Sequence, residues 1–227
     1  MLDIYLRNGR IFLAVKLFLP EHANGVGVVF SHGWGGAHLF DDLHAFLARS
    51  GVTVASLEQR GYGQSTGKAV LGKWPEDMAA VGEWLRVRTR RIWTMGLATG
   101  GTMALVTAGK YDWIAGAIAL SPFATLKLIR HDYPPGKEIL ADRFGTFRSE
   151  DFKTADGLSW TAKIAPRPAL VVHARNDEIV PFSHAEMLRD KSGATLWDIP
   201  DGDHRLQTID RLGLFKRIKQ TLVKDSG

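Results

Sequence analysis

The amino-acid sequence predicts an α/β fold, a mostly parallel β-sheet with helices packed on both faces. The prediction rests first on short apolar runs that alternate with segments whose apolar residues recur at helical spacing. It rests second on the runs themselves, several of which are apolar throughout, as in strands buried on both faces. The chain has 227 residues, 45% hydrophobic and 23% charged, so we expect one domain with a sizeable core.

A β-hairpin is expected near the start, where Ile4–Leu6 and Ile11–Phe18 flank the dipeptide Asn8-Gly9. Asn-Gly supplies the positive φ angles that a tight hairpin turn requires. The strands expected after the hairpin are short and mostly apolar, namely Val26–Ser31, Val52–Leu57, Ile92–Met95, Ile114–Leu120, Ala169–Val172 and Thr195–Ile199.

Helices are expected between these strands, which makes most of the strands parallel. Pro75 suits the first turn of one helix, and Gly51 follows the end of another. The expected helices are Leu39–Arg49, Glu76–Val87, Thr99–Gly109, Ser183–Lys191 and a closing helix from about His204 to Val223.

The alternation breaks over about residues 123–165, which show no regular period. We interpret this segment as an insertion, a short lid that lies over the sheet edge. Among its aromatic residues, Tyr133, Phe144 and Phe147 are the candidates to line a substrate pocket, because such pockets are mostly apolar. The alternative is that they pack together as a small satellite core, and the sequence favours neither.

Unusual residues follow the ends of the expected strands. In an open parallel sheet, ligands bind outside the carboxyl ends of the strands, so these segments are expected to meet at one edge. They are Ser31–Gly36, Glu58–Ser65, Gly96–Gly101, Ala174–Pro181 and Asp201–His204.

This series, in this order, resembles the α/β-hydrolase fold over nearly the whole chain, in particular single-domain serine esterases and related lipases with a short lid. The family's oxyanion loop, its Gly-x-Ser-x-Gly elbow, its acid loop and its terminal histidine match His32–Gly36, Gly96–Gly100, Asp177–Pro181 and His204. Such an elbow is a strained strand-to-helix turn that projects the nucleophile, and its flanking glycines permit the turn.

The resemblance implies a role for each matching residue. Ala98 occupies the nucleophile position, Asp177 would orient the imidazole, and His204 would serve as general base and then as general acid. The backbone N–H groups of Trp34 and Thr99 would stabilise the developing oxyanion. The implied activity is hydrolysis of a carboxylic ester, a thioester or an amide.

An alanine methyl group cannot attack a carbonyl, so the chain as written is expected to be inactive or nearly so. Three explanations remain open. Ala98 is an inactivating Ser→Ala substitution in an otherwise intact hydrolase, which the retained glycines, Asp177 and His204 favour. Alternatively, the chain is a natural non-catalytic relative that binds a small hydrophobic or acyl ligand. In the third, Thr99 replaces the nucleophile, although its side chain is expected to point into the helix.

Other residues of these loops have structural interpretations. His32 is expected to shape its loop. Arg60 is expected to bond to backbone in its turn, with a substrate carboxylate as the alternative partner. Asp201 and Asp203 are expected to cap the closing helix.

Composition limits the partners. The net charge of +5 comes from scattered Lys and Arg, and the one dense run, Arg86 to Arg91, is interpreted as a solvated helix end rather than a nucleic-acid site. No histidine spacing suggests a metal site, and we expect no cofactor. The expected partner is a small acyl or ester substrate, with monomer and homodimer both open.

The expected location is the cytoplasm, without membrane association. The sequence contains no cysteine, which excludes disulfides. Asp3 and Arg7 interrupt the first apolar segment, unlike in a signal peptide, and no apolar run reaches the roughly 20 residues that span a bilayer.

Overall fold

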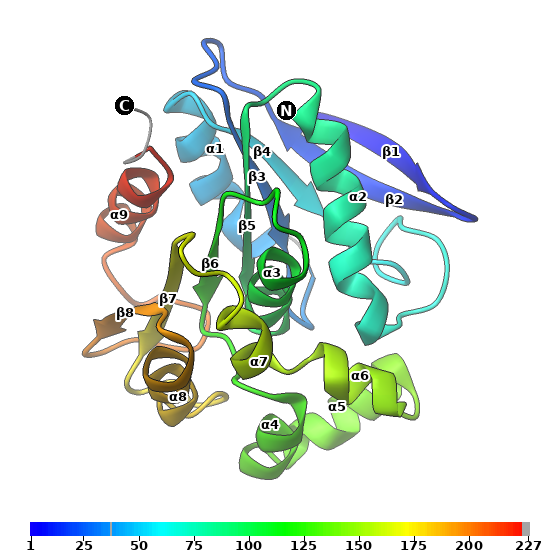
Figure 1. The fold of residues 1–227 in the computed structure, drawn as a ribbon, viewed down its shortest axis with the longest axis vertical. Coiled ribbons are helices and arrows are strands. Elements are labelled where there is room, and N and C mark those ends of the chain that lie inside the picture. Colours follow the sequence, from blue (N-terminus) through cyan, green and yellow to red (C-terminus); the bar gives the residue numbers. More distant parts are fainter. Residues whose placement is uncertain (37, 224–227) are drawn as a thin grey trace.

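The structure is a computed structural model that describes residues 1–36 and 38–223. Its centre is one eight-stranded sheet with the order β1-β2-β4-β3-β5-β6-β7-β8 (Figure 1). The pairs β1–β2 and β2–β4 are antiparallel, and every later pair is parallel. The strands are β1 (Leu2–Asn8), β2 (Ile11–Phe18), β3 (Val26–Ser31), β4 (Thr53–Leu57), β5 (Arg91–Leu97), β6 (Gly116–Leu120), β7 (Ala169–Ala174) and β8 (Thr195–Ile199). The predicted α/β architecture and its opening hairpin are therefore confirmed.

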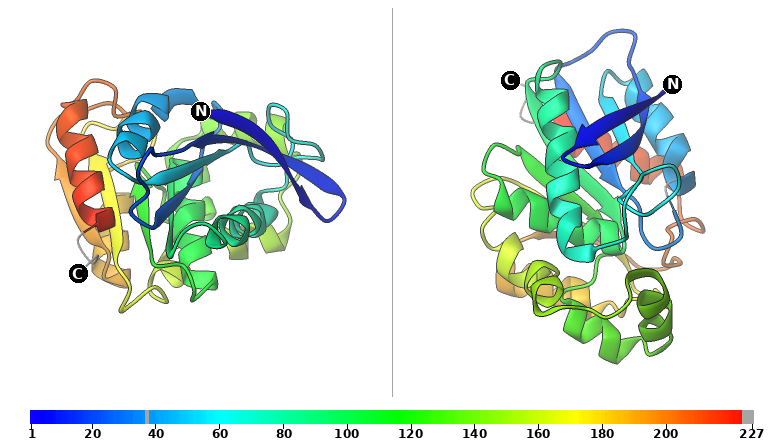
Figure 2. Two further views of the ribbon diagram at one scale, coloured as in Figure 1. Left: turned by 90° about the horizontal axis from the view of Figure 1, so that it is seen from above. Right: turned by 90° about the vertical axis from the view of Figure 1, so that its right-hand side faces the viewer.

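Helices cover both faces of this sheet (Figure 2). The helices α1 and α9 contact each other and share one hydrophobic cluster. The helices α2 and α3 also contact each other, and both contribute buried residues to a second cluster. The helices are α1 (Asp41–Arg49), α2 (Trp74–Arg86), α3 (Thr99–Lys110), α4 (Leu126–Asp132), α5 (Pro135–Phe144), α6 (Ser149–Thr154), α7 (Gly157–Thr161), α8 (Ser183–Ser192) and α9 (Arg211–Val223).

The core lies on both sides of the sheet because the central strands are buried on both faces. In β3, Val28 and Phe30 pack with Phe40 on the α1 side, whereas Val29 packs with Trp74 on the α2 side. This two-sided burial explains why the strand reads as a continuous apolar run rather than an alternating one.

The insertion between β6 and β7 folds into α4, α5, α6 and α7. Figure 1 shows α4, α5 and α6 grouped beyond the carboxyl end of β6, so this group lies over the strand ends rather than over the sheet edge. The last helix of the insertion, α7, instead packs against α3 and α8. The absence of one regular period follows from the shortness of these four helices.

The closing helix begins at Arg211 rather than at His204, which corrects the prediction. The residues before it form a loop. Asp203 accepts hydrogen bonds from two backbone N–H groups within that loop, and Asp201 accepts one from a side chain of the neighbouring loop. Neither aspartate caps the helix, whereas Asp210 accepts a hydrogen bond from an N–H group in its first turn.

Arg60 does not bond to backbone as predicted. Its Nε and Nη2 atoms each donate a hydrogen bond of 2.6 Å to the carboxylate of Asp77 in α2. Asn8 donates a third hydrogen bond, of 2.8 Å, to the same carboxylate. The Asp77 side chain is fully buried, and these donors offset part of the cost of removing water from its charge, although burial still raises the pKa of the carboxyl group.

Arg60→Ala should lower the free energy of unfolding by about 3 kcal/mol, because it leaves the buried carboxylate of Asp77 without its cation. Urea unfolding measures the change. Arg86→Ala is the matched control, because Arg86 pairs with Glu83 in an exposed contact, where a loss of less than about 1 kcal/mol is expected. Equal losses in the two variants would contradict a structural role for the Arg60–Asp77 pair.

Candidate active site

Ala98 occupies a sharp turn between β5 and α3. Its φ of 51° and ψ of −117° belong to a region that residues with a side chain rarely adopt, and such a conformation costs about 1–3 kcal/mol. Glycines on either side make the turn fit. A Cβ on Gly96 would lie 2.4 Å from the carbonyl carbon of Gly100, and a Cβ on Gly100 would lie 2.2 Å from the carbonyl oxygen of Ser31. Only glycine therefore permits this approach to the end of β3.

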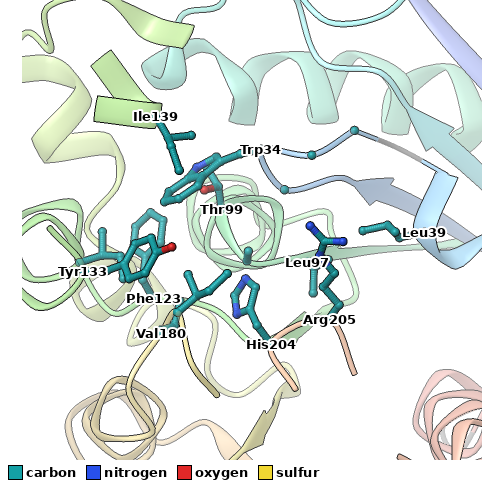
Figure 3. A pocket seen from close by; sticks show the side chains of 16 residues that line it. Trp34, Leu39, Leu97, Thr99, Phe123, Tyr133, Ile139, Val180, His204 and Arg205 are labelled. Atoms are coloured by element: carbon teal, nitrogen blue, oxygen red, sulfur yellow. The ribbon is translucent and has the colours of Figure 1, made fainter. Parts of the chain in front are cut away.

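A cavity of about 340 Å³ opens beside this turn (Figure 3). The residues that line it include Ala98, His204 and Arg205, and the glycine-rich loop that follows β3. The rest of its lining is largely apolar, with contributions from Leu39, Leu97, Phe123, Ile129, Tyr133, Ile139, Ile179 and Val180.

Asp177 and His204 come together at this cavity from the loops that follow β7 and β8. The Nδ1 atom of His204 lies 2.8 Å and 3.0 Å from the two carboxylate oxygens of Asp177. The same carboxylate accepts hydrogen bonds from the backbone N–H groups of Ile179 and Val180, at 2.9 Å and 2.8 Å. This arrangement commits Nδ1 of the imidazole to the carboxylate and leaves its Nε2 for other partners.

His173, on β7, also contacts Asp177 and was not identified as a site residue in the sequence. Its Nε2 lies 2.9 Å from the carbonyl oxygen of Val180 and 3.2 Å from Oδ2 of Asp177. Because both partners are acceptors, Nε2 carries the proton and donates it to both. The available signal was its place four residues before Asp177, in a strand otherwise apolar.

The hydrogen bonds to Asp177 determine its charge. Burial would raise the pKa of this carboxyl group, but hydrogen bonds from His173, His204 and the Val180 N–H hold the pKa well below its usual range. The carboxylate is therefore ionised at neutral pH, although its side chain is fully buried.

Trp34, in the loop after β3, and Thr99, next to Ala98, both line the cavity. Thr99 is the first residue of α3, where backbone N–H groups have no partner within the helix. Its side chain is fully buried, and the expectation that it points into the helix stays a prediction. In the described part of the chain, neither the Thr99 hydroxyl nor Nε1 of Trp34 has a hydrogen-bond partner.

The three aromatic residues predicted to line the pocket separate into two groups. Tyr133 lines the cavity, but Phe144 and Phe147 do not. Phe144 packs 5.7 Å from the ring centroid of Trp74 and 5.8 Å from that of Phe147, within a cluster that joins the insertion to α2. The satellite-core alternative therefore describes these two phenylalanines.

His32 shapes the loop after β3, in agreement with the interpretation from sequence. Its Nδ1 contacts the carbonyl oxygen of Gly33, and its Nε2 accepts a hydrogen bond of 3.1 Å from the N–H of Gln59. Among residues 1–36 and 38–223, no group of three or more His, Asp or Glu side chains is arranged to hold a metal ion. In the same ranges, no helix is long and apolar enough to cross a membrane.

Two solved structures share this fold over nearly the whole chain. An esterase from Pyrococcus furiosus superposes with a TM-score of 0.81 and 20% identity, covering 99% of this chain and 91% of its own. Est1E from Butyrivibrio proteoclasticus, solved with ferulic acid bound, gives a TM-score of 0.79 and 20% identity, covering 97% and 98% of the two chains.

The curated relatives are longer than the segments that match this chain. YfhR of Escherichia coli, an uncharacterised protein, is 27% identical over 197 residues, and the match covers 82% of this chain but only 65% of YfhR. A thermostable monoacylglycerol lipase from Bacillus sp. strain H-257 is 25% identical over 187 residues, which are 72% of this chain and 75% of the lipase.

The model of one protein family, described as serine aminopeptidase S33, matches residues 23–150, which is more than half of the chain. This match spans the loop after β3, the turn at Ala98 and the whole of the helices α4 and α5. The chain therefore belongs to this family of the α/β-hydrolase superfamily.

Proposed function

We propose that this site is that of a serine hydrolase acting on carboxylic esters, with its nucleophile position occupied by Ala98. The observation that carries the proposal is the convergence of Ala98 and the Asp177–His204 pair on one largely apolar cavity. The coarser assignment, an α/β-hydrolase of the esterase and lipase type, follows from the family and the fold. Thioesters and amides are the related substrate classes, since the same acyl-transfer mechanism hydrolyses them.

The proposed reaction uses the chain's own residues in fixed roles. In the serine-bearing form, the hydroxyl at position 98 attacks the ester carbonyl while Nε2 of His204 accepts its proton. Asp177 holds the imidazole through Nδ1 and stabilises the imidazolium. The backbone N–H groups of Thr99 and Trp34 face the developing oxyanion. His204 then donates its proton to the leaving alkoxide, and water hydrolyses the acyl-enzyme by the same route.

Two features support the interpretation of Ala98 as an inactivating substitution. The strained backbone at position 98 persists although a methyl group gains nothing chemical from it. The costly burial of an ionised Asp177 also persists, together with its partner His204. Both features are ones that a nucleophile at position 98 would use.

The second candidate is a natural non-catalytic protein that binds a small hydrophobic or acyl ligand. Ala98 itself favours it, because an alanine at this position removes turnover and leaves the cavity in place. The apolar lining of that cavity, with Phe123, Tyr133 and Ile139, suits such a ligand equally well.

Ala98→Ser should raise the hydrolysis of a p-nitrophenyl ester series at least about a thousandfold over the chain as it stands, because it supplies the missing nucleophile. The added His204→Ala change should abolish the gain. Ala98→Gly is the control, since it relieves the backbone strain without adding a hydroxyl group, and it should stay inactive. If the serine variant hydrolyses no ester, thioester or amide, the binding protein is the better account.

Asp177→Asn should reduce the amount by which the free energy of unfolding falls in acid. A carboxyl group with a lowered folded-state pKa stabilises the fold above its unfolded pKa, and this contribution is lost as the pH falls through the folded value. The chain as it stands should therefore lose about 1 kcal/mol more of its unfolding free energy between pH 6 and pH 3 than Asp177→Asn does. Urea unfolding at the two pH values measures this, and parallel losses would show that Asp177 is not held as an anion.

A further inference from the structure

The cavity extends to both sides of His204, and the two sides differ in character. Figure 3 shows Trp34, Phe123, Tyr133 and Ile139 gathered on one side, where they form an apolar chamber. Arg205 stands on the other side, near Leu39. A substrate whose reacting carbonyl lies between Ala98 and His204 therefore has one arm in the apolar chamber and the other directed toward Arg205.

Arg205 is exposed, and within the described part of the chain it is the one Arg, Lys, Asp or Glu that lines the cavity. No ion pair or hydrogen bond of its guanidinium is found among residues 1–36 and 38–223. Its neighbours differ in this respect, because Arg211 pairs with Asp42 and Arg175 pairs with Asp198. The guanidinium at the cavity mouth is therefore available to an anion.

The loop that carries Arg205 is held in place. Leu206 is fully buried, and its φ of 53° is a conformation that a leucine rarely adopts. Its N–H donates a hydrogen bond of 3.0 Å to the carbonyl oxygen of Asp203, and the Asp203 carboxylate accepts a further one of 2.7 Å from the N–H of Gln207. The backbone of Arg205 is thus fixed beside the cavity before a ligand arrives, which reduces the entropy lost on binding.

We propose that the substrate of this site is an ester that carries a carboxylate on the arm facing Arg205 and an apolar group on the arm in the chamber. This proposal rests on the ester hydrolase proposed above and specifies its substrate class. A guanidinium binds a carboxylate through two parallel hydrogen bonds, which fixes orientation as well as affinity. The apolar chamber enforces the same orientation, because an unpaired carboxylate is costly to bury there.

The test measures binding by the chain as it stands, because Ala98 prevents turnover. Two probes place the carboxylate on different arms of the ester, 4-butanoyloxybenzoate on the alcohol arm and monophenyl glutarate on the acyl arm. Each has a neutral partner in which a carboxamide replaces the carboxylate. Calorimetric titration gives the dissociation constants for the chain, for Arg205→Gln and for Arg10→Gln, which removes the same charge from the exposed turn of the hairpin.

At least one carboxylate probe should bind about tenfold more tightly than its carboxamide, and Arg205→Gln should remove that difference. Arg10→Gln should preserve it, and the neutral probes should bind alike to all three chains. The arm whose probe responds identifies the half of the ester that carries the anion.

Equal binding of carboxylate and carboxamide, or a difference that survives Arg205→Gln, overturns the inference while the proposed hydrolase stands. Failure of the neutral esters to bind, together with an inactive Ala98→Ser variant, overturns the proposed hydrolase itself and this inference with it.

Discussion

The close approach of two backbone segments, the turn after β5 and the end of β3, is the constraint on which the site depends. No side chain fits between Gly100 and the carbonyl groups of Ser31 and His32, so α3 begins directly against the neighbouring strand. This contact brings the loop after β3 next to Ala98, where a Cβ on Gly33 would lie 3.3 Å from the Cβ of Ala98. Main-chain packing alone therefore brings the backbone N–H groups proposed to stabilise an oxyanion next to the nucleophile position.

The position of His204 at the cavity depends on a different interaction, its contact with the buried carboxylate of Asp177. Asp177 is fully buried, and the hydrogen bonds from His173, His204 and backbone N–H groups keep it ionised. A buried charge needs its hydrogen-bond donors, and those of Asp177 come from the loop after β7 and from His204 in the loop after β8. The anion therefore holds these two loops together. The position of Arg205 follows from the same arrangement, because it is the residue next to His204.

The fold and the order of the site loops could be predicted from sequence because both depend on local patterns. The apolar run Val26–Ser31 matches a strand to the residue, and glycines indicated the turn at Ala98. Errors arose where a partner distant in sequence decides the outcome. Arg60 binds Asp77 from another element, and Phe144 packs onto α2 rather than into the cavity. No local pattern reports such contacts, which depend on how the elements pack.

The central claim is that position 98 is the site of a nucleophile that His204 activates. It is tested most directly by treating the Ala98→Ser variant with a fluorophosphonate, which reacts covalently with an activated serine, and by mapping the modified peptide by mass spectrometry. The account predicts stoichiometric modification at position 98, and none when His204→Ala is added. An unmodified variant, or modification that does not depend on His204, would contradict it.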